Sequence, residues 1–81
     1  MGVTLVLFAA AREAAGTGHD EVDGATVGEV LARAVARYGD HFGAVLERSR
    51  VWVNGSPADP ADPVRPGDEV AVLPPVSGGA A

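Results

Sequence analysis

The first strand-like segment of the chain, residues 3–8, is a run of apolar residues with Thr4 as its one polar position. In an extended strand, successive side chains point to opposite faces, so Val6 and Phe8 share one face while Leu5 and Leu7 share the other. Shorter runs with the same character follow later in the chain. These runs predict further strands at residues 19–22, 51–53 and 69–73.

The most clearly marked element is a helix. Thr26 and Glu29 have the T-x-x-E spacing of a capping box, which satisfies free N–H groups at a helix start. From Val27 to Tyr38 apolar residues then recur at i, i+3 and i+4 spacing, which predicts one buried stripe. Gly39 is placed to end this helix. A short helical turn or a loop is expected over residues 9–15, and a further short turn of helix over residues 41–48.

Turn signals separate these elements. Asn54-Gly55 favours a tight hairpin turn, the proline-rich stretch Pro57–Pro63 is expected to be a loop, and Pro74-Pro75 ends the last strand. A right-handed crossover through the helix can place the first and last strands side by side and parallel. The sequence therefore predicts an α+β fold of the β-grasp (ubiquitin-like) type. We expect a mixed sheet of four to five strands with one main helix on one face, a domain over residues 1–76 and a flexible tail over residues 77–81.

Composition narrows the function classes. A chain of 81 residues is long enough for one domain. The absence of cysteine excludes disulfides, thiolate metal sites and a cysteine nucleophile. All six basic residues are arginines, and the formal net charge of −5 argues against nucleic acid as a partner. The apolar segment at residues 5–11 is too short to span a membrane, so we expect a cytoplasmic protein that does not act at a membrane.

The usual catalytic and cofactor-binding patterns are missing. His19 and His41 lack metal-ligand spacing, and structural roles are favoured for both. Gly16-Thr17-Gly18 begins like a dinucleotide-binding fingerprint, but Glu21 occupies the position of the third glycine. The sequence therefore predicts neither a metal nor a cofactor bound by this chain.

Four short motifs occur in a specific order and spacing. They are Leu7-Phe8-Ala9 with Arg12-Glu13, Val51-Trp52-Val53-Asn54-Gly55, Gly67-Asp68-Glu69-Val70-Ala71, and Pro74-Pro75-Val76-Ser77-Gly78-Gly79. In this order the chain resembles, over nearly its whole length, the small subunit of molybdopterin synthase, which is a ubiquitin-like sulfur carrier.

The resemblance implies that the carboxylate of Gly79 is the reacting group. A ubiquitin-activating-type adenylating enzyme would activate it with ATP, and a sulfur donor would convert it into a thiocarboxylate. The large subunit of molybdopterin synthase would then accept the tail and use the sulfur to build molybdopterin. Gly78 has no Cβ atom, so it suits a residue that threads through a narrow tunnel.

A docking surface is expected near the tail. If the first and last strands are neighbours, Val6 and Phe8 lie beside Ala71 and Leu73 as an exposed apolar patch, and such patches often bind partners. Ordinary exposed apolar residues are an equally good reading. The predicted partner-binding residues are Phe8, Arg12, Leu73, Pro74, Pro75 and Val76.

The chain departs from the family pattern at its end, because Ala80 and Ala81 follow Gly79. One hypothesis is that a trimming peptidase removes both alanines. A second is that the sulfur serves another pathway, which makes cysteine, thiamine or a thio-sugar. A third is a β-grasp interaction module whose tail never reacts. Without lysine the chain cannot receive an isopeptide-linked partner, although an activated Gly79 could modify a lysine elsewhere.

Overall fold

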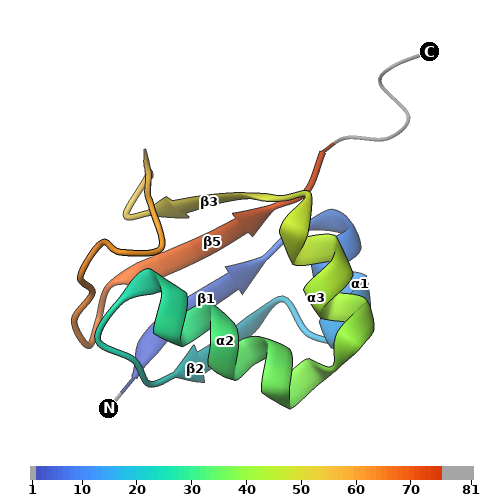
Figure 1. The fold of residues 1–81 in the computed structure, drawn as a ribbon, viewed down its shortest axis with the longest axis horizontal. Coiled ribbons are helices and arrows are strands. Elements are labelled where there is room, and N and C mark those ends of the chain that lie inside the picture. Colours follow the sequence, from blue (N-terminus) through green and yellow to red (C-terminus); the bar gives the residue numbers. More distant parts are fainter. Residues whose placement is uncertain (1, 76–81) are drawn as a thin grey trace.

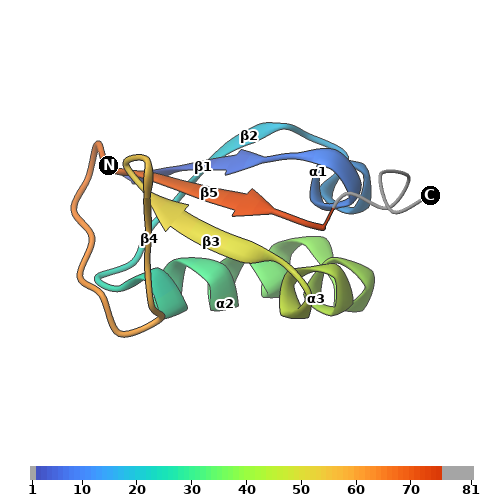
Figure 2. The same ribbon diagram turned by 90° about the horizontal axis from the view of Figure 1, so that it is seen from above.

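The computed structural model describes residues 2–75. Its elements, in chain order, are β1 (Val3–Leu7), α1 (Ala9–Ala15), β2 (His19–Val22), α2 (Val27–Tyr38), α3 (Asp40–Glu47), β3 (Arg50–Val53), β4 (Ser56–Pro57) and β5 (Glu69–Leu73). The strands form one five-stranded sheet with the order β2-β1-β5-β3-β4. Helices α2 and α3 lie across one face of this sheet, and α1 lies at the end where β1 finishes (Figures 1 and 2).

The centre of the sheet is the parallel pair of β1 and β5. Its register runs from Thr4 opposite Glu69 to Leu7 opposite Val72. On its other side β1 pairs with β2 in antiparallel orientation, and β5 pairs with β3 in the same way. Parallel neighbours need a long crossover connection, which the helices between β2 and β3 help to supply. The predicted β-grasp arrangement, with adjacent and parallel first and last strands, is confirmed.

The hydrophobic core lies between the sheet and the helices. Leu5 from β1, Val70 and Val72 from β5, and Phe42 from α3 are all 0% exposed. The ring of Phe42 meets that of Tyr38 edge to face, with 5.1 Å between the ring centroids. On β5 these residues alternate with half-buried or exposed ones, whereas on β1 Val6, which points to the other face, is also buried at 9%. Only one face of the sheet is covered by α2 and α3 (Figure 2).

The cap of α2 forms as the sequence predicts. The Glu29 backbone N–H donates to the Thr26 hydroxyl at 3.2 Å. The Glu29 carboxylate in turn accepts from the Ala25 N–H at 2.9 Å. At the other end Gly39 has φ +102°, a conformation that favours glycine, and its N–H donates to the Val35 carbonyl. These contacts fix where α2 begins and ends.

Three expectations need correction. Phe8 was expected within the first strand, but it is the N-cap of α1. Pro57 was expected in a loop, but it pairs with Trp52 as part of β4. Because β4 is the outermost strand, the missing N–H of Pro57 leaves no gap inside the sheet. Helix α3 begins and ends one residue earlier than residues 41–48.

Within residues 2–75 the structure contains no helix that is both long enough and apolar enough to cross a membrane.

Candidate functional site

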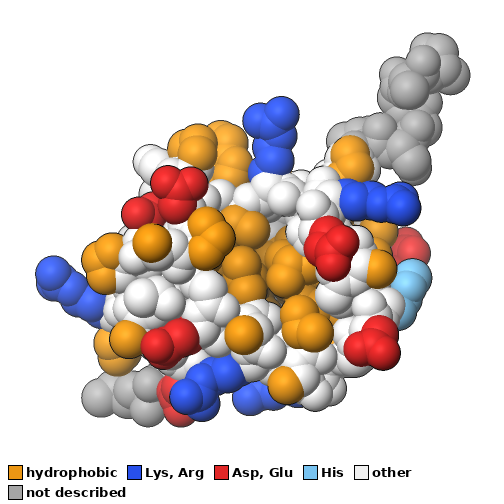
Figure 3. Space-filling view, in the orientation of Figure 1, with side chains coloured by type: hydrophobic (Ala, Val, Ile, Leu, Met, Phe, Trp, Pro, Cys, Tyr) orange, Lys and Arg blue, Asp and Glu red, His pale blue; other side chains and the backbone are white. Residues whose placement is uncertain are grey.

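The helix side of the molecule carries an apolar groove. Figure 3 shows hydrophobic side chains gathered in a central hollow on this side. The groove has a volume of about 630 Å³ and lies between α2, the end of α3 and the β3–β4 edge of the sheet. Its lining includes Leu31, Val35, Leu46 and Val51, and Arg50 is its one charged lining residue. A groove lined in this way offers no acid–base chemistry of its own.

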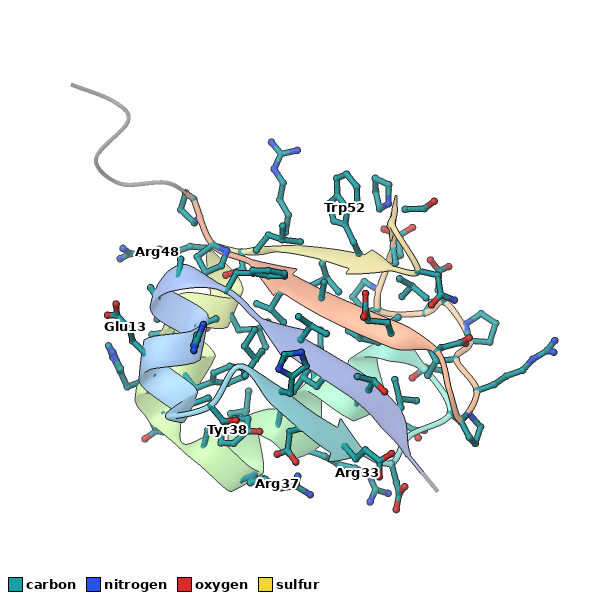
Figure 4. All side chains as sticks on the ribbon, turned by 180° about the vertical axis from the view of Figure 1, so that it is seen from behind. Glu13, Arg33, Arg37, Tyr38, Arg48 and Trp52 are labelled. Carbon is teal, nitrogen blue, oxygen red and sulfur yellow. The ribbon has the colours of Figure 1, made fainter. Side chains whose placement is uncertain are left out.

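The opposite side of the sheet is not covered by α2 or α3, and Figure 4 looks onto it. We call this surface the bare face and define it by Val6, Phe8, Trp52, Ala71 and Leu73. Backbone register places Val6 opposite Ala71, and Ala71 opposite Trp52, so these three form one row across three strands. The row continues to His19 on one side and Pro57 on the other. The expectation of an exposed patch needs correction here, because Val6 is buried and Ala71, Leu73 and Trp52 are half-buried, so that Phe8 is the exposed member of the bare face.

A second row lies at the end of the sheet where β5 finishes. Phe8 follows β1 with an extended backbone, φ −119° and ψ 154°, so its side chain points away from the face used by Leu7. Its N–H donates to the Val72 carbonyl at 3.3 Å, which ties it to β5 beside Leu73. Phe8 is 46% exposed, and within residues 2–75 it is the one large hydrophobic residue that is exposed.

Polar residues border this second row. Arg50 of β3 pairs in register with Leu73. Each is two residues from Trp52 or Ala71 on its own strand, so all four side chains belong to the same face. Arg12 lies on α1, and its backbone N–H donates to the Phe8 carbonyl at 3.3 Å. Both arginines are exposed. The bare face is therefore apolar, with cationic groups beside the end from which the C-terminal segment continues.

The structure brings together most of the predicted partner-binding residues. Phe8, just after β1, is bonded to β5 next to Leu73, and Pro74 is buried while Pro75 is exposed. Arg12 is close to Phe8 through the first turn of α1. The remaining predicted site residues lie outside the described part of the chain. They are Val76, Gly78 and Gly79, together with Ala80 and Ala81.

Sequence reasoning did not place Trp52, Pro57 or Arg50 on this surface. Trp52 could have been found from strand alternation, because Val51 and Val53 pack toward the core, whereas Arg50 lies just before the predicted strand at residues 51–53. Pro57 could not, since its position follows from the two-residue strand that was expected to be a loop. All three also line the helix-side groove, so they form the β3–β4 edge at which the groove and the bare face meet.

The groups with shifted pKa values lie in two structural contacts. The hydroxyl of Tyr38 donates to the Asp20 carboxylate, and Arg37 donates to the same carboxylate at 2.7 Å. These hydrogen bonds lower the pKa of Asp20, while burial and the Asp20 charge raise the pKa of Tyr38 to about 12. The Arg65 N–H and the Asn54 amide lower the pKa of Asp68 in the same way.

Both contacts hold elements together. The first joins α2 to β2, and the second closes the turns beside β5. Among the described residues, no three His, Asp or Glu side chains lie close enough to hold a metal ion. The candidate site is therefore a surface for a partner, with the chain's own C-terminal segment beginning at its edge.

Several solved structures are similar to this chain. SAMP1 from Haloferax volcanii is 31% identical, covers 98% of this chain and 100% of its own, and has a TM-score of 0.82. The putative molybdopterin converting factor, subunit 1, from Pyrococcus furiosus is 25% identical over 94% of this chain and 99% of its own, with a TM-score of 0.82. A chain of the BexX/CysO complex from Amycolatopsis orientalis is 25% identical over 95% and 99%, with a TM-score of 0.80.

No curated protein sequence matches this chain. The model of the ThiS family matches residues 5–79, which is almost the whole chain and includes Gly78 and Gly79. The match agrees with the five-stranded mixed sheet and with the similar solved structures. The chain therefore belongs to the ThiS family of ubiquitin-like sulfur carriers.

Proposed function

We propose that this protein carries sulfur as a thiocarboxylate on Gly79 and delivers it for the synthesis of molybdopterin. The observation that carries the proposal is the position of the bare face relative to the chain end. Phe8 and Leu73 lie at the end of the sheet from which Pro74 and Pro75 lead toward Gly78 and Gly79. A partner that binds this surface would receive the tail directly.

The chemistry matches the residues available. A carboxylate resists attack until one oxygen becomes part of a good leaving group, and adenylation by a partner enzyme with ATP supplies that group. A sulfur nucleophile can then displace AMP at the Gly79 carbonyl carbon. Neither step needs a catalytic side chain from this chain, and none of its described residues forms a metal-binding cluster. In this proposal the partners supply the catalysis.

Two lines of support favour molybdopterin as the destination of the sulfur. The first is the order of the motifs that begin with Leu7-Phe8-Ala9 and end with Pro74–Gly79. The second is the similarity to molybdopterin converting factor subunit 1, which suggests the large synthase subunit as the accepting partner. The alternative is another sulfur-accepting pathway, and the similarity to the BexX/CysO complex at the same identity supports it.

The two residues after Gly79 require one further step. With Ala80 and Ala81 attached, the free carboxylate belongs to Ala81 and not to Gly79. We therefore include in the proposal a peptidase that removes both alanines before adenylation.

The test is the intact mass of the protein recovered from its native cells. We expect a species that ends at Gly79 and has one carboxylate oxygen replaced by sulfur. A homogeneous species that still ends at Ala81, in the presence of the adenylating enzyme, ATP and sulfur donor, would contradict the proposal. That result would favour a binding module whose tail does not react.

Two variants make the test specific. Gly79→Val should abolish formation of the thiocarboxylate, because the branched side chain blocks a tunnel that admits glycine. Ser77→Ala changes the same segment without adding bulk and should leave sulfur loading unchanged. Feeding the loaded protein to the large synthase subunit with the molybdopterin precursor would then separate the proposed pathway from its alternative.

A further inference from the structure

Charge is distributed unevenly along β5. Many of the carboxylates lie at the end of the molecule where β5 begins. The loop before β5 is held against the start of α2 there, because the Val27 N–H donates to the Asp62 carbonyl and the Thr4 N–H donates to the Asp68 carbonyl. The charged residues of this end include Glu21, Asp23, Glu29, Asp59, Asp62, Arg65, Asp68 and Glu69.

The bare face shows the same gradient in its cross-strand rows. The row at the start of β5 contains Glu21, Thr4 and Glu69, which pair in register across β2, β1 and β5. The middle row is the apolar one that contains Val6 and Ala71. The last row contains Phe8, Leu73 and Arg50, and Arg12 follows Phe8 within one helical turn. Side chains on one face thus change from anionic to apolar to cationic toward the chain end.

The cationic row is available for a partner. Within residues 2–75 the one salt bridge joins Arg37 to Asp20, so neither Arg12 nor Arg50 is ion-paired there. Arg50 is exposed and lies directly opposite Leu73, two residues before Pro75. Arg12 and Glu13 lie on α1, and Glu47 and Arg48 lie at the end of α3. None of these four occupies a position in the cross-strand rows, so among the described residues Arg50 is the one charged residue of the last row.

We infer that the adenylating enzyme, as the first partner to receive the tail, presents carboxylates around the opening of its tail-binding channel, and that Arg50, assisted by Arg12, pairs with them. This inference rests on the proposed function and adds the chemistry of its partner. The overall charge of −5 would suggest a basic partner, but in the described part of the chain the cross-strand row where the tail leaves the sheet contains Arg50 and no carboxylate. Pairing at this row would also orient the carrier, since the reversed orientation brings Glu21 and Glu69 against the partner's carboxylates.

The length of the tail allows the Arg50 contact and the reaction at Gly79 to occur at different places on the partner. The four residues from Val76 to Gly79 can span at most about 14 Å if fully extended. The reacting carbonyl can therefore lie deep in the partner while Arg50 meets the partner's outer surface. Arg50 acts in docking and orientation, and it is not a catalytic residue.

The experiment uses the full chain ending at Gly79 and the adenylating enzyme of the same cells, with ATP–pyrophosphate exchange as the readout. Arg50→Glu should raise the carrier concentration needed for half-maximal exchange by about tenfold or more at low salt, with little change in the maximal rate. The loss should shrink as ionic strength rises, because exposed charges are screened. Arg12→Glu combined with Arg50→Glu should cause a larger loss.

Arg33→Glu is the matched control, because it makes the same change in net charge at an exposed position of α2, away from the bare face. We expect it to change exchange by less than about twofold. Equal effects of Arg50→Glu and Arg33→Glu, with both variants folded by circular dichroism, would overturn the inference. A wild-type chain ending at Gly79 that is never adenylated would overturn the proposed function itself, and the inference with it.

Discussion

Trp52 lies directly opposite Ala71 in the antiparallel pair of β3 and β5, with Val6 on the far side of Ala71. A small side chain between two larger ones leaves a shallow apolar surface at the middle of the bare face. Ala71→Arg would fill this surface with a long charged side chain that can extend into water, so the fold should persist. We expect at least a tenfold loss of binding to the adenylating enzyme, measured by titration calorimetry with the chain ending at Gly79.

Thr4→Arg provides the control for this prediction. Thr4 is on the same face, but it pairs with Glu69 at the opposite end of β5. It should retain binding within about threefold, since peripheral contacts contribute little to affinity. If Ala71→Arg binds as well as the wild type, the bare face is not the docking surface.

The two phenylalanines should differ sharply in their effect on stability. Phe42 is 0% exposed and packs edge to face against Tyr38, whereas Phe8 is 46% exposed. Phe42→Ala should lower the free energy of unfolding by about 3–5 kcal/mol, because it leaves a cavity in a small core. Phe8→Ala should lower it by less than about 1.5 kcal/mol. Urea denaturation followed by circular dichroism measures both, and similar losses for the two variants would contradict this account of the core.

Much of the fold could be predicted because local signals agree with the tertiary structure. The capping box at Thr26 and Glu29 and the stop at Gly39 mark α2 within one residue. The alternation of strand side chains over residues 3–8 assigns Leu5 and Leu7 to the core, and the pairing of β1 with β5 follows from crossover handedness.

The missed features depend on contacts between distant residues. Pro57 joins the sheet only because the turn at Asn54 and Gly55 brings it back against Trp52. The placement of Arg50 beside Leu73 requires the β3–β5 register, which nothing in either segment alone specifies. Propensity describes a residue's neighbours in sequence, whereas a docking surface is made from residues on separate strands.

The turn after β3 depends on Asn54 for both conformation and hydrogen bonds. Its φ is +50°, its amide donates to Asp68 at 3.1 Å, and its side-chain oxygen accepts from the Glu69 N–H at 2.9 Å. Asn54→Gly keeps the backbone conformation and loses both bonds, which should cost about 1–2 kcal/mol. Asn54→Ala adds the strain of a left-handed alanine, about 1 kcal/mol more.

Thermal and urea unfolding of these two variants separate the cost of the lost hydrogen bonds from the cost of the backbone strain. Equal stability of Asn54→Gly and Asn54→Ala would mean that the left-handed conformation is not strained. A wild-type value for Asn54→Gly would mean that the two hydrogen bonds contribute nothing to the free energy of unfolding.

Tyr38 is the one tyrosine in the chain, so its ionisation can be followed by ultraviolet absorbance without interference from another phenol. Burial, and then the hydrogen bond to Asp20, raise its pKa to about 12. Because the folded pKa lies above the unfolded value of 10.0, this stabilisation is complete below that value and is lost as the pH rises toward 12. Asp20→Asn should lower the midpoint, since it removes the negative charge beside the phenol. A wild-type midpoint at the ordinary value, with Trp52 fluorescence still native, would contradict the contact.

The same contact predicts a loss of stability in acid. Hydrogen bonds from Tyr38 and then Arg37 lower the pKa of Asp20 from 3.8 in the folded protein. The unfolded chain therefore takes up the proton first, so the stabilisation is present above the unfolded value and disappears as the pH falls through the folded one.

Urea unfolding of the wild type between about pH 5 and pH 2 should show a steeper loss of stability than Asp20→Asn shows. Asp20→Asn keeps the part of the slope that Asp68 contributes, because the pKa of Asp68 is lowered as well. Tyr38→Phe removes the largest cause of the Asp20 shift, so its acid profile should approach that of Asp20→Asn. The variant that combines Asp20→Asn with Tyr38→Phe should lose less free energy of unfolding than the two single variants lose in sum, because both substitutions act on the same hydrogen bond. Parallel acid profiles for the wild type and all three variants would mean that the Asp20 contact does not join α2 to β2 in solution.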